Sequence, residues 1–190
     1  MKILIVDNGT TYLKQLVKLV SPAIPNIKLY SELVDADCDD YDLIILSGGH
    51  KHSVVGHASE LSKEINLLKN TKSAVLGICF GFELIAYSFG ALLKQLPSKS
   101  QRIISIKRTV DDQLFTGISK IEVFESHRWV VEKMPAEIVG LANSTEGIEI
   151  IKHKDKPIYG FQFHPEMFPN LSDGDELFAN FVKIVQNRGT

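Results

Sequence analysis

The sequence predicts an α/β fold in which a mostly parallel central sheet is flanked by helices and extended by an antiparallel β section. In the first 90 residues, short continuous apolar runs of the kind that form buried parallel strands alternate with amphipathic helical patterns. After Gly90, apolar runs follow one another without helical patterns between them. A final amphipathic pattern then predicts a helix at the end of the chain.

Length and composition limit the classes of protein. A chain of 190 residues is expected to form a single domain, residues 1–190, with one sizeable core. A net charge of −2 gives no reason to expect binding to nucleic acid or to a membrane. The sequence contains no apolar run long enough to cross a bilayer and no signal-peptide pattern. Two widely separated cysteines then predict a reducing, cytoplasmic location with free thiols.

The first half of the chain alternates strands and helices. Residues 3–6 are apolar without interruption and predict a first, buried strand. Apolar residues at i, i+3, i+4 and i+7 predict a helix over 13–20, which a Ser-Pro pair ends. Residues 27–30 and 43–46 are two further short strands. Between them an acidic segment, 35–40, predicts a solvated loop that carries a cysteine without a role, Cys38.

A strand, a sharp turn and a helix follow over residues 74–90. Apolar residues after the turn recur at helical spacing, and Gly90 stands where this helix should end. The antiparallel section is predicted from four apolar runs, and a fifth run ends at a His-Pro-Glu sequence. Ser172 is expected to cap the last helix. The five runs are 102–109, 121–124, 138–142, 147–151 and 157–163.

The turn at Cys79 is the first candidate for chemistry. Gly77 and Gly81 flank it in a G-x-C-x-G pattern, which holds the cysteine between a buried strand and a helix N-terminus. The helix dipole and the N–H groups there favour a thiolate, and glycines let a substrate approach closely. On its own, the pattern fits a buried structural cysteine about equally well.

His164 and Glu166 supply the base that a cysteine nucleophile needs. They stand two residues apart at a predicted strand end, so both side chains are expected on the same side of the chain. Parallel strands end at one edge of a sheet, where such a pair can meet Cys79. The predicted roles are nucleophile for Cys79, proton shuttle for His164 and orienting acid for Glu166.

Two backbone N–H groups are candidates for stabilising an oxyanion. The residue after the nucleophile, Phe80, offers one, and Gly49 at the end of a neighbouring strand offers the other. Taken alone, Gly48 and Gly49 are better explained as a tight exit from the strand.

Three segments together resemble the class I (triad-type) glutamine amidotransferases, over essentially the whole chain. They are Gly77-Ile-Cys-Phe-Gly81, Ser47-Gly-Gly49 and Tyr159-Gly-Phe-Gln-Phe-His-Pro-Glu166. The resemblance implies a flavodoxin-like fold and hydrolysis of the glutamine side-chain amide through a γ-glutamyl thioester on Cys79. It implies no cofactor, and it implies a separate synthetase (ATP pyrophosphatase) subunit that receives the ammonia.

Within the family, Asp7-Asn8-Gly9, Glu125-Ser126-His127 and Lys156-Pro-Ile-Tyr-Gly160 are most similar to the stand-alone glutaminase subunit of archaeal-type GMP synthetase. Glutaminase subunits of anthranilate and aminodeoxychorismate synthases usually carry a different motif after the first Asp-Asn. Two further alternatives stay open: a hydrolase of another γ-glutamyl amide or peptide, and a catalytically weak regulatory homologue.

The resemblance makes Gly48, Glu83, Ser126 and His127 the expected substrate-binding residues. Glu83 stands where the family often has a glutamine that holds the substrate, and His50 stands where it usually has proline. Both departures put the specificity for glutamine in question. His50, His52 and His57 share one polar loop, but no cysteine or carboxylate completes a ligand set there, so no metal is predicted.

Overall fold

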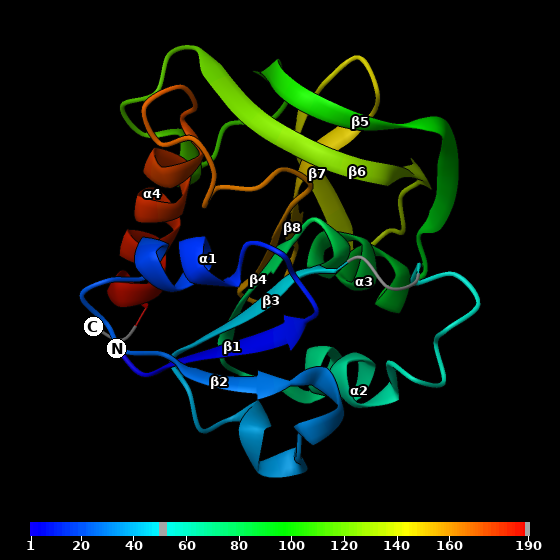
Figure 1. The fold of residues 1–190 in the computed structure, drawn as a ribbon, viewed down its shortest axis with the longest axis vertical. Helices are drawn as coiled ribbons and strands as arrows, with labels where there is room; N and C mark the ends of the chain where they lie inside the picture. Colours follow the sequence, from blue (N-terminus) through cyan, green and yellow to red (C-terminus); the bar gives the residue numbers. More distant parts are fainter. Residues whose placement is uncertain (50–52, 189–190) are drawn as a thin grey trace.

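The computed structural model describes residues 1–49 and 53–188 and contains one nine-stranded sheet (Figure 1). The strand order is β2-β1-β3-β4-β9-β8-β7-β5-β6. The strands are β1 Ile3–Asn8, β2 Asn26–Leu29, β3 Leu43–Gly49, β4 Ala74–Ile78, β5 Leu92–Arg108, β6 Ile121–Lys133, β7 Ile138–Asn143, β8 Ile148–His153 and β9 Ile158–Phe161. The helices are α1 Leu13–Leu19, α2 Ser62–Asn70, α3 Phe80–Ser88 and α4 Gly174–Asn187, with short 3₁₀ turns at Tyr30–Glu32, Asp35–Cys38 and Gln113–Phe115.

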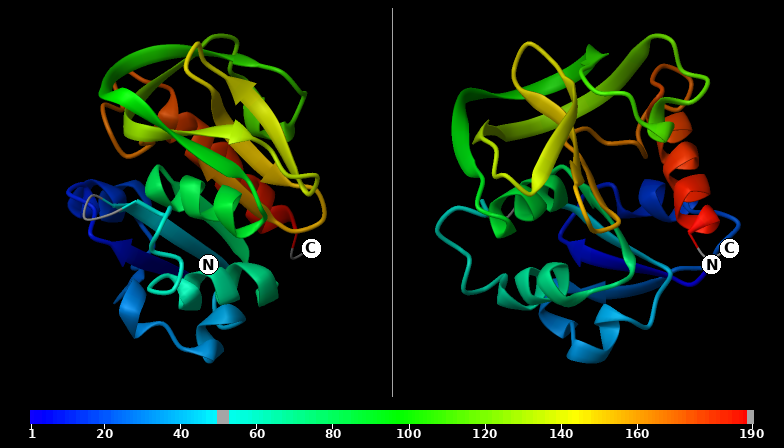
Figure 2. Two further views of the ribbon diagram at one scale, coloured as in Figure 1. Left: turned by 90° about the vertical axis from the view of Figure 1, so that its right-hand side faces the viewer. Right: turned by 180° about the vertical axis from the view of Figure 1, so that it is seen from behind.

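The sheet has a parallel half and an antiparallel half, which confirms the predicted fold class. Strands β2, β1, β3, β4 and β9 run parallel to one another. Strands β8, β7, β5 and β6 continue the sheet in antiparallel pairings. Strands β5 and β6 arch across one end of the parallel half, above α3 (Figure 2). The two halves therefore enclose the carboxyl ends of β3, β4 and β9.

Alternation along the strands divides the core between the two faces of the sheet. Ile3 and Ile5 of β1 pack on the face covered by α1 and α4, whereas Leu4 and Val6 pack on the face covered by α2 and α3 (Figure 1). Both faces of the parallel strands are buried, which explains why these strands are continuous apolar runs. None of the helices in the described part of the chain is long and apolar enough to cross a membrane.

Three local predictions are wrong. Cys38 is not a surface thiol: most of the segment 35–40 is exposed, but Asp35–Cys38 form a 3₁₀ turn in which Asp37 is buried against Lys28 at 2.7 Å and the Cys38 side chain is buried. Ser172 does not cap the last helix, because its hydroxyl donates to the carbonyl of Met167 and α4 begins at Gly174. Strands β5 and β6 are also much longer than their apolar runs, since their polar residues lie in a two-stranded ribbon with one exposed face.

Candidate active site

Cys79 lies in a strained turn between β4 and α3. Its φ of 51° and ψ of −100° are rare for a residue with a side chain. The turn is fixed on both sides, because the Cys79 amide donates to the Phe161 carbonyl at 2.8 Å and the Cys79 carbonyl accepts from the Glu83 amide at 3.0 Å. The predicted elbow between a buried strand and a helix is therefore present in the structure.

The glycines of this turn are required by close packing of α3 on the sheet. A Cβ on Gly81 would overlap the backbone of Leu46 in β3. A Cβ on Gly77 would overlap the backbone of Gly81 and come within 2.6 Å of the Ile85 side chain. The pattern G-x-C-x-G thus reflects the approach of the helix to two strands as well as the turn itself.

His164 and Glu166 are in contact, as expected. Nδ1 of His164 lies 2.8 Å from Oε1 of Glu166, and both side chains are buried. A carboxylate accepts, so Nδ1 carries the proton and Nε2 is left as the acceptor. The predicted reason was wrong, however: β9 ends at Phe161, and the pair is held by a turn in which the Met167 amide donates to the His164 carbonyl at 3.2 Å.

Gly48 lies between the cysteine and the histidine. A Cβ on Gly48 would stand 3.0 Å from Cε1 of His164 and 3.8 Å from Cβ of Cys79. Both side chains therefore flank the same glycine at the end of β3, although they are distant in the sequence. A substituent on Gly48 would contact both side chains. The next residue, His50, lies outside the described residues, as does His52 of the same polar loop.

The environment of Cys79 holds it as a thiol. Burial raises the pKa of the Cys79 thiol well above its usual range, and the charges of Glu83 and Glu166 act in the same direction. The Phe80 N–H and the charge of Lys99 oppose this shift. The sulfur donates to the Ser126 carbonyl at 3.7 Å, so in this state the proton points toward β6.

A cavity of about 390 Å³ opens beside the sulfur and is large enough for an amino-acid side chain. Four of the residues that line it with Cys79 were predicted as site residues: Gly49, Phe80, Glu83 and Ser126. His127 also lines it, but both ring nitrogens of His127 face neighbouring protein groups. The remaining lining residues were not predicted as site residues; they are Ser53, Gln95, Lys99, Arg128 and Trp129.

Lys99 reaches this cavity from an irregularity in β5. The pairing of β5 with β6 shifts register between Gln95 and Ser100, and the Arg128 guanidinium donates to two carbonyls of that bulge, those of Leu96 at 3.5 Å and Pro97 at 3.4 Å. A proline within an apparently polar segment was the available signal. The bulge places a cation at the same cavity as Glu83, where it can attract a substrate carboxylate.

Glu83 is buried in the first turn of α3, one turn beyond Cys79. Burial raises its pKa to about 8, although the charge of His127 and a hydrogen bond from Nε2 of Gln162, at 3.4 Å, act against the shift. At neutral pH the carboxyl group is therefore mostly protonated. In that form it can both donate and accept, as a glutamine side chain does.

Replacing Glu83 by glutamine is expected to flatten the pH dependence of stability. The pKa is near 4.5 in the unfolded chain and about 8 in the folded protein, so ionisation opposes folding increasingly as pH rises between these values. Glu83→Gln cannot ionise and should gain roughly 1–3 kcal/mol relative to wild type between pH 5 and pH 8. Urea unfolding at both pH values measures this gain. The exposed control Glu60→Gln should show none, and an equal gain in both variants would contradict the prediction.

Comparison with known proteins identifies the family of this chain. The sequence model of one family, glutamine amidotransferase class-I, matches residues 4–184. The chain belongs to the class-I glutamine amidotransferases. The family and the class of enzyme that the sequence analysis predicted are therefore confirmed.

Relatives of this amidotransferase extend over its full length. A glutamine-hydrolyzing GMP synthase subunit from Methanosphaera stadtmanae is 34% identical over 98% of this chain and 100% of its own. The protein of the same name from Pyrococcus abyssi is 32% identical over 96% and 97% of the two chains. The crystal structure of a candidate GMP synthase subunit from Thermoplasma acidophilum has a TM-score of 0.87 and 25% identity, covering 99% of this chain and 95% of its own.

Proposed function

We propose that this amidotransferase is the glutaminase subunit of a two-subunit GMP synthetase. It hydrolyses the side-chain amide of glutamine and supplies the ammonia to a separate ATP pyrophosphatase subunit. The observation that carries the hydrolytic part is the placement of a strained Cys79 and of the His164–Glu166 pair beside the same glycine, Gly48. The names of the full-length relatives support the choice of synthetase.

The proposed reaction begins with transfer of the Cys79 proton to Nε2 of His164 as the sulfur adds to the amide carbon. Glu166 keeps the other ring nitrogen protonated and stabilises the imidazolium. The Phe80 N–H, with that of Gly49, stabilises the oxyanion. The imidazolium then protonates the leaving nitrogen, ammonia departs, and water hydrolyses the thioester to glutamate with His164 as base.

The residues that line the cavity orient the substrate in this proposal. Lys99 attracts the α-carboxylate of glutamine, while Glu83 and Ser126 contact its polar groups beside the sulfur. Gly48 leaves the space in which the amide is attacked. Because the resting thiol points to Ser126 and has a raised pKa, we expect the glutaminase on its own to hydrolyse glutamine slowly and a docked synthetase to accelerate it.

The test combines this chain with the ATP pyrophosphatase subunit from the same genome, ATP, Mg²⁺ and xanthosine 5′-monophosphate, which carries an oxo group where GMP carries its 2-amino group. Glutamate release and GMP formation are followed with glutamine or with ammonium as nitrogen source. With Cys79→Ala we expect glutamine-dependent GMP formation to fall to background while ammonium-dependent formation persists. If wild type and Cys79→Ala supported equal glutamine-dependent synthesis, the proposal would fail.

A second candidate function is hydrolysis of another γ-glutamyl amide, and the carboxyl group of Glu83 in the cavity favours it. A substrate panel distinguishes the two: glutamine, γ-glutamyl methylamide and a γ-glutamyl dipeptide, assayed with the synthetase present. A preference for glutamine of about 100-fold or more in kcat/KM would remove this candidate.

A further inference from the structure

A buried cluster of acids lies behind the wall of the glutamine cavity. Glu125 and His127 project from β6 and Glu149 from β8, and each offers one ligand atom within 4.8 Å of the others. All three residues are almost completely buried. Among the described residues, this is the group of histidine, cysteine and acidic side chains with the spacing of a metal site.

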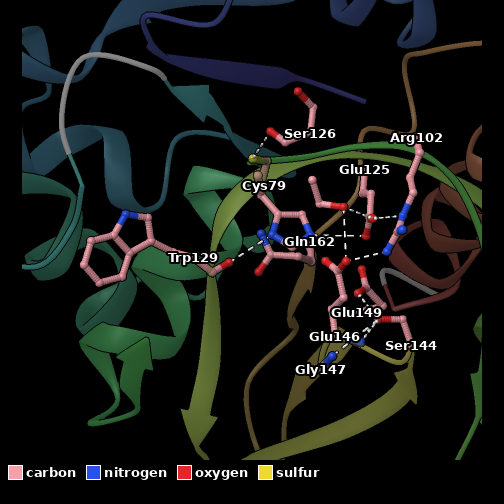
Figure 3. A network of polar contacts seen from close by, with 12 residues as sticks. Cys79, Arg102, Glu125, Ser126, Trp129, Ser144, Glu146, Gly147, Glu149 and Gln162 are labelled. Carbon is pink, nitrogen blue, oxygen red and sulfur yellow. Dashed lines mark hydrogen bonds and ion pairs between the residues drawn. The ribbon is translucent and has the colours of Figure 1, made fainter. Parts of the chain in front are cut away.

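Each of the three side chains has one polar atom held by a neighbour, which fixes its orientation. Figure 3 labels two of the three, Glu125 and Glu149, with their partners Arg102 and Ser144. Oε1 of Glu125 accepts from the Ser100 hydroxyl and from Arg102 at 3.1 Å. Oε1 of Glu149 accepts from the Ser144 hydroxyl at 2.8 Å. Nδ1 of His127 lies 3.1 Å from the Trp129 carbonyl, which can only accept, so Nδ1 carries a proton.

This arrangement brings three side-chain atoms that can bind a metal ion, one from each residue, close together. Nε2 of His127 lies 3.3 Å from Oε2 of Glu125. Oε2 of Glu149 is buried and has no hydrogen-bond partner within the described residues. A histidine whose second nitrogen is bound to a backbone carbonyl, beside carboxylates held by hydroxyl and guanidinium groups, is the usual environment of a metal ligand.

We propose that His127, Glu125 and Glu149 bind a divalent transition-metal ion of the Zn²⁺ type. Ligand atoms around tetrahedral zinc lie roughly 3.3 Å apart, which is the separation of the His127 and Glu125 atoms. A shift of about 1.5 Å in the Glu149 carboxylate would complete three contacts. One imidazole with two carboxylates suits zinc or manganese better than magnesium or calcium, which prefer oxygen ligands alone.

Charge also favours a cation. Three buried acids, Glu83, Glu125 and Glu149, act on His127, and the half-buried Glu146 lies near Glu149. Arg102 pairs with Glu125 and Glu146. Buried carboxylates are stable only when they are paired, protonated or bound to a metal. In the metal-free protein, the raised pKa values of His127, Glu83 and Glu149 favour protonation of these three groups, and their protons supply the balancing charge.

The ion would hold the wall of the glutamine cavity. Ser126 stands between the two ligands of β6, and its carbonyl accepts from the Cys79 sulfur. A metal ion joining β6 to β8 therefore fixes the backbone that faces the nucleophile. This role goes beyond glutamine hydrolysis itself and does not depend on which synthetase receives the ammonia.

The test measures binding of Zn²⁺, with Mn²⁺ as a second probe, to protein treated with chelator and then refolded from urea with or without the metal. Refolding removes slow entry into a buried site as an explanation for weak binding. We expect one equivalent of bound metal by elemental analysis and a higher Tm of the metal-loaded protein. Glu149→Gln, which is nearly isosteric with the protonated acid, should lower the affinity about 100-fold or more while the metal-free protein still folds.

Two controls separate this site from adventitious binding. Glu146→Gln changes a neighbouring acid outside the ligand group and should keep the affinity. A triple variant, His50→Ala, His52→Ala and His57→Ala, removes the histidines of the polar loop and should keep it as well. Failure to bind either metal after refolding would overturn the proposal. Binding that survives Glu149→Gln and His127→Asn but is lost in the triple variant would overturn it equally.

Discussion

Replacing Glu166 by glutamine is expected to lower kcat for glutamine hydrolysis about 10³- to 10⁴-fold while the protein stays folded. Oε1 of Glu166 accepts from Nδ1 of His164 at 2.8 Å. The amide of glutamine can donate to Nδ1 instead, which moves the imidazole proton to Nε2. In that tautomer His164 cannot take the proton from Cys79, and nothing stabilises an imidazolium. Glutamate release in the presence of the synthetase measures the loss.

Two comparisons make this prediction specific to the triad. Glu176→Gln changes an exposed acid on α4 and should retain full activity. Far-ultraviolet circular dichroism and Tm should show that Glu166→Gln is folded. If Glu166→Gln kept more than about a tenth of the wild-type kcat, Glu166 would not orient the base, and another group would have to hold His164.

The parts of the site that could be predicted are those encoded by contiguous sequence. A strand, a cysteine between glycines and a helix are local features, and their geometry follows from the turn they must make. His164 and Glu166 were predicted to meet for the same local reason, although a turn and not a strand brings them together. Their place beside Cys79 followed from the rule that parallel strands end at one edge of the sheet.

The parts that could not be predicted depend on pairing between distant segments. Glu149 reaches Glu125 and His127 because β8 and β6 lie in the same antiparallel half, an order that no local pattern encodes. Lys99 reaches the cavity because a bulge displaces it from the β5 ladder. Cys38 is buried because the 3₁₀ turn packs its carbonyl against the hydroxyls of two residues near β4, Thr71 and Ser73. In each case the placement of the residue depends on a tertiary partner that local sequence does not show.

Substituting alanine for Gly81 is expected to destabilise the protein by roughly 3–5 kcal/mol, a large part of the usual stability of a domain. The new methyl group would overlap the Leu46 carbonyl and lie 2.9 Å from the Leu46 Cβ. These atoms belong to the central strand β3 and cannot rotate away, so α3 would have to lift from the sheet. The gain of about 1 kcal/mol in helix propensity from glycine to alanine is too small to compensate. Urea unfolding, or the soluble yield where folding fails, measures the effect.

Gly140→Ala is the matched control because it adds the same methyl group to a glycine within a strand. There the new Cβ would lie 3.3 Å from the Ile148 side chain, which is flexible and can adjust. We expect its effect on the free energy of unfolding to stay within about 1 kcal/mol. Because α3 begins directly after Cys79, Gly81→Ala should displace the nucleophile from His164, and any folded fraction should hydrolyse glutamine poorly. If the two variants were equally stable, α3 could move away from β3 without loss of stability. The close contact between helix and strand would then not explain why residue 81 is glycine.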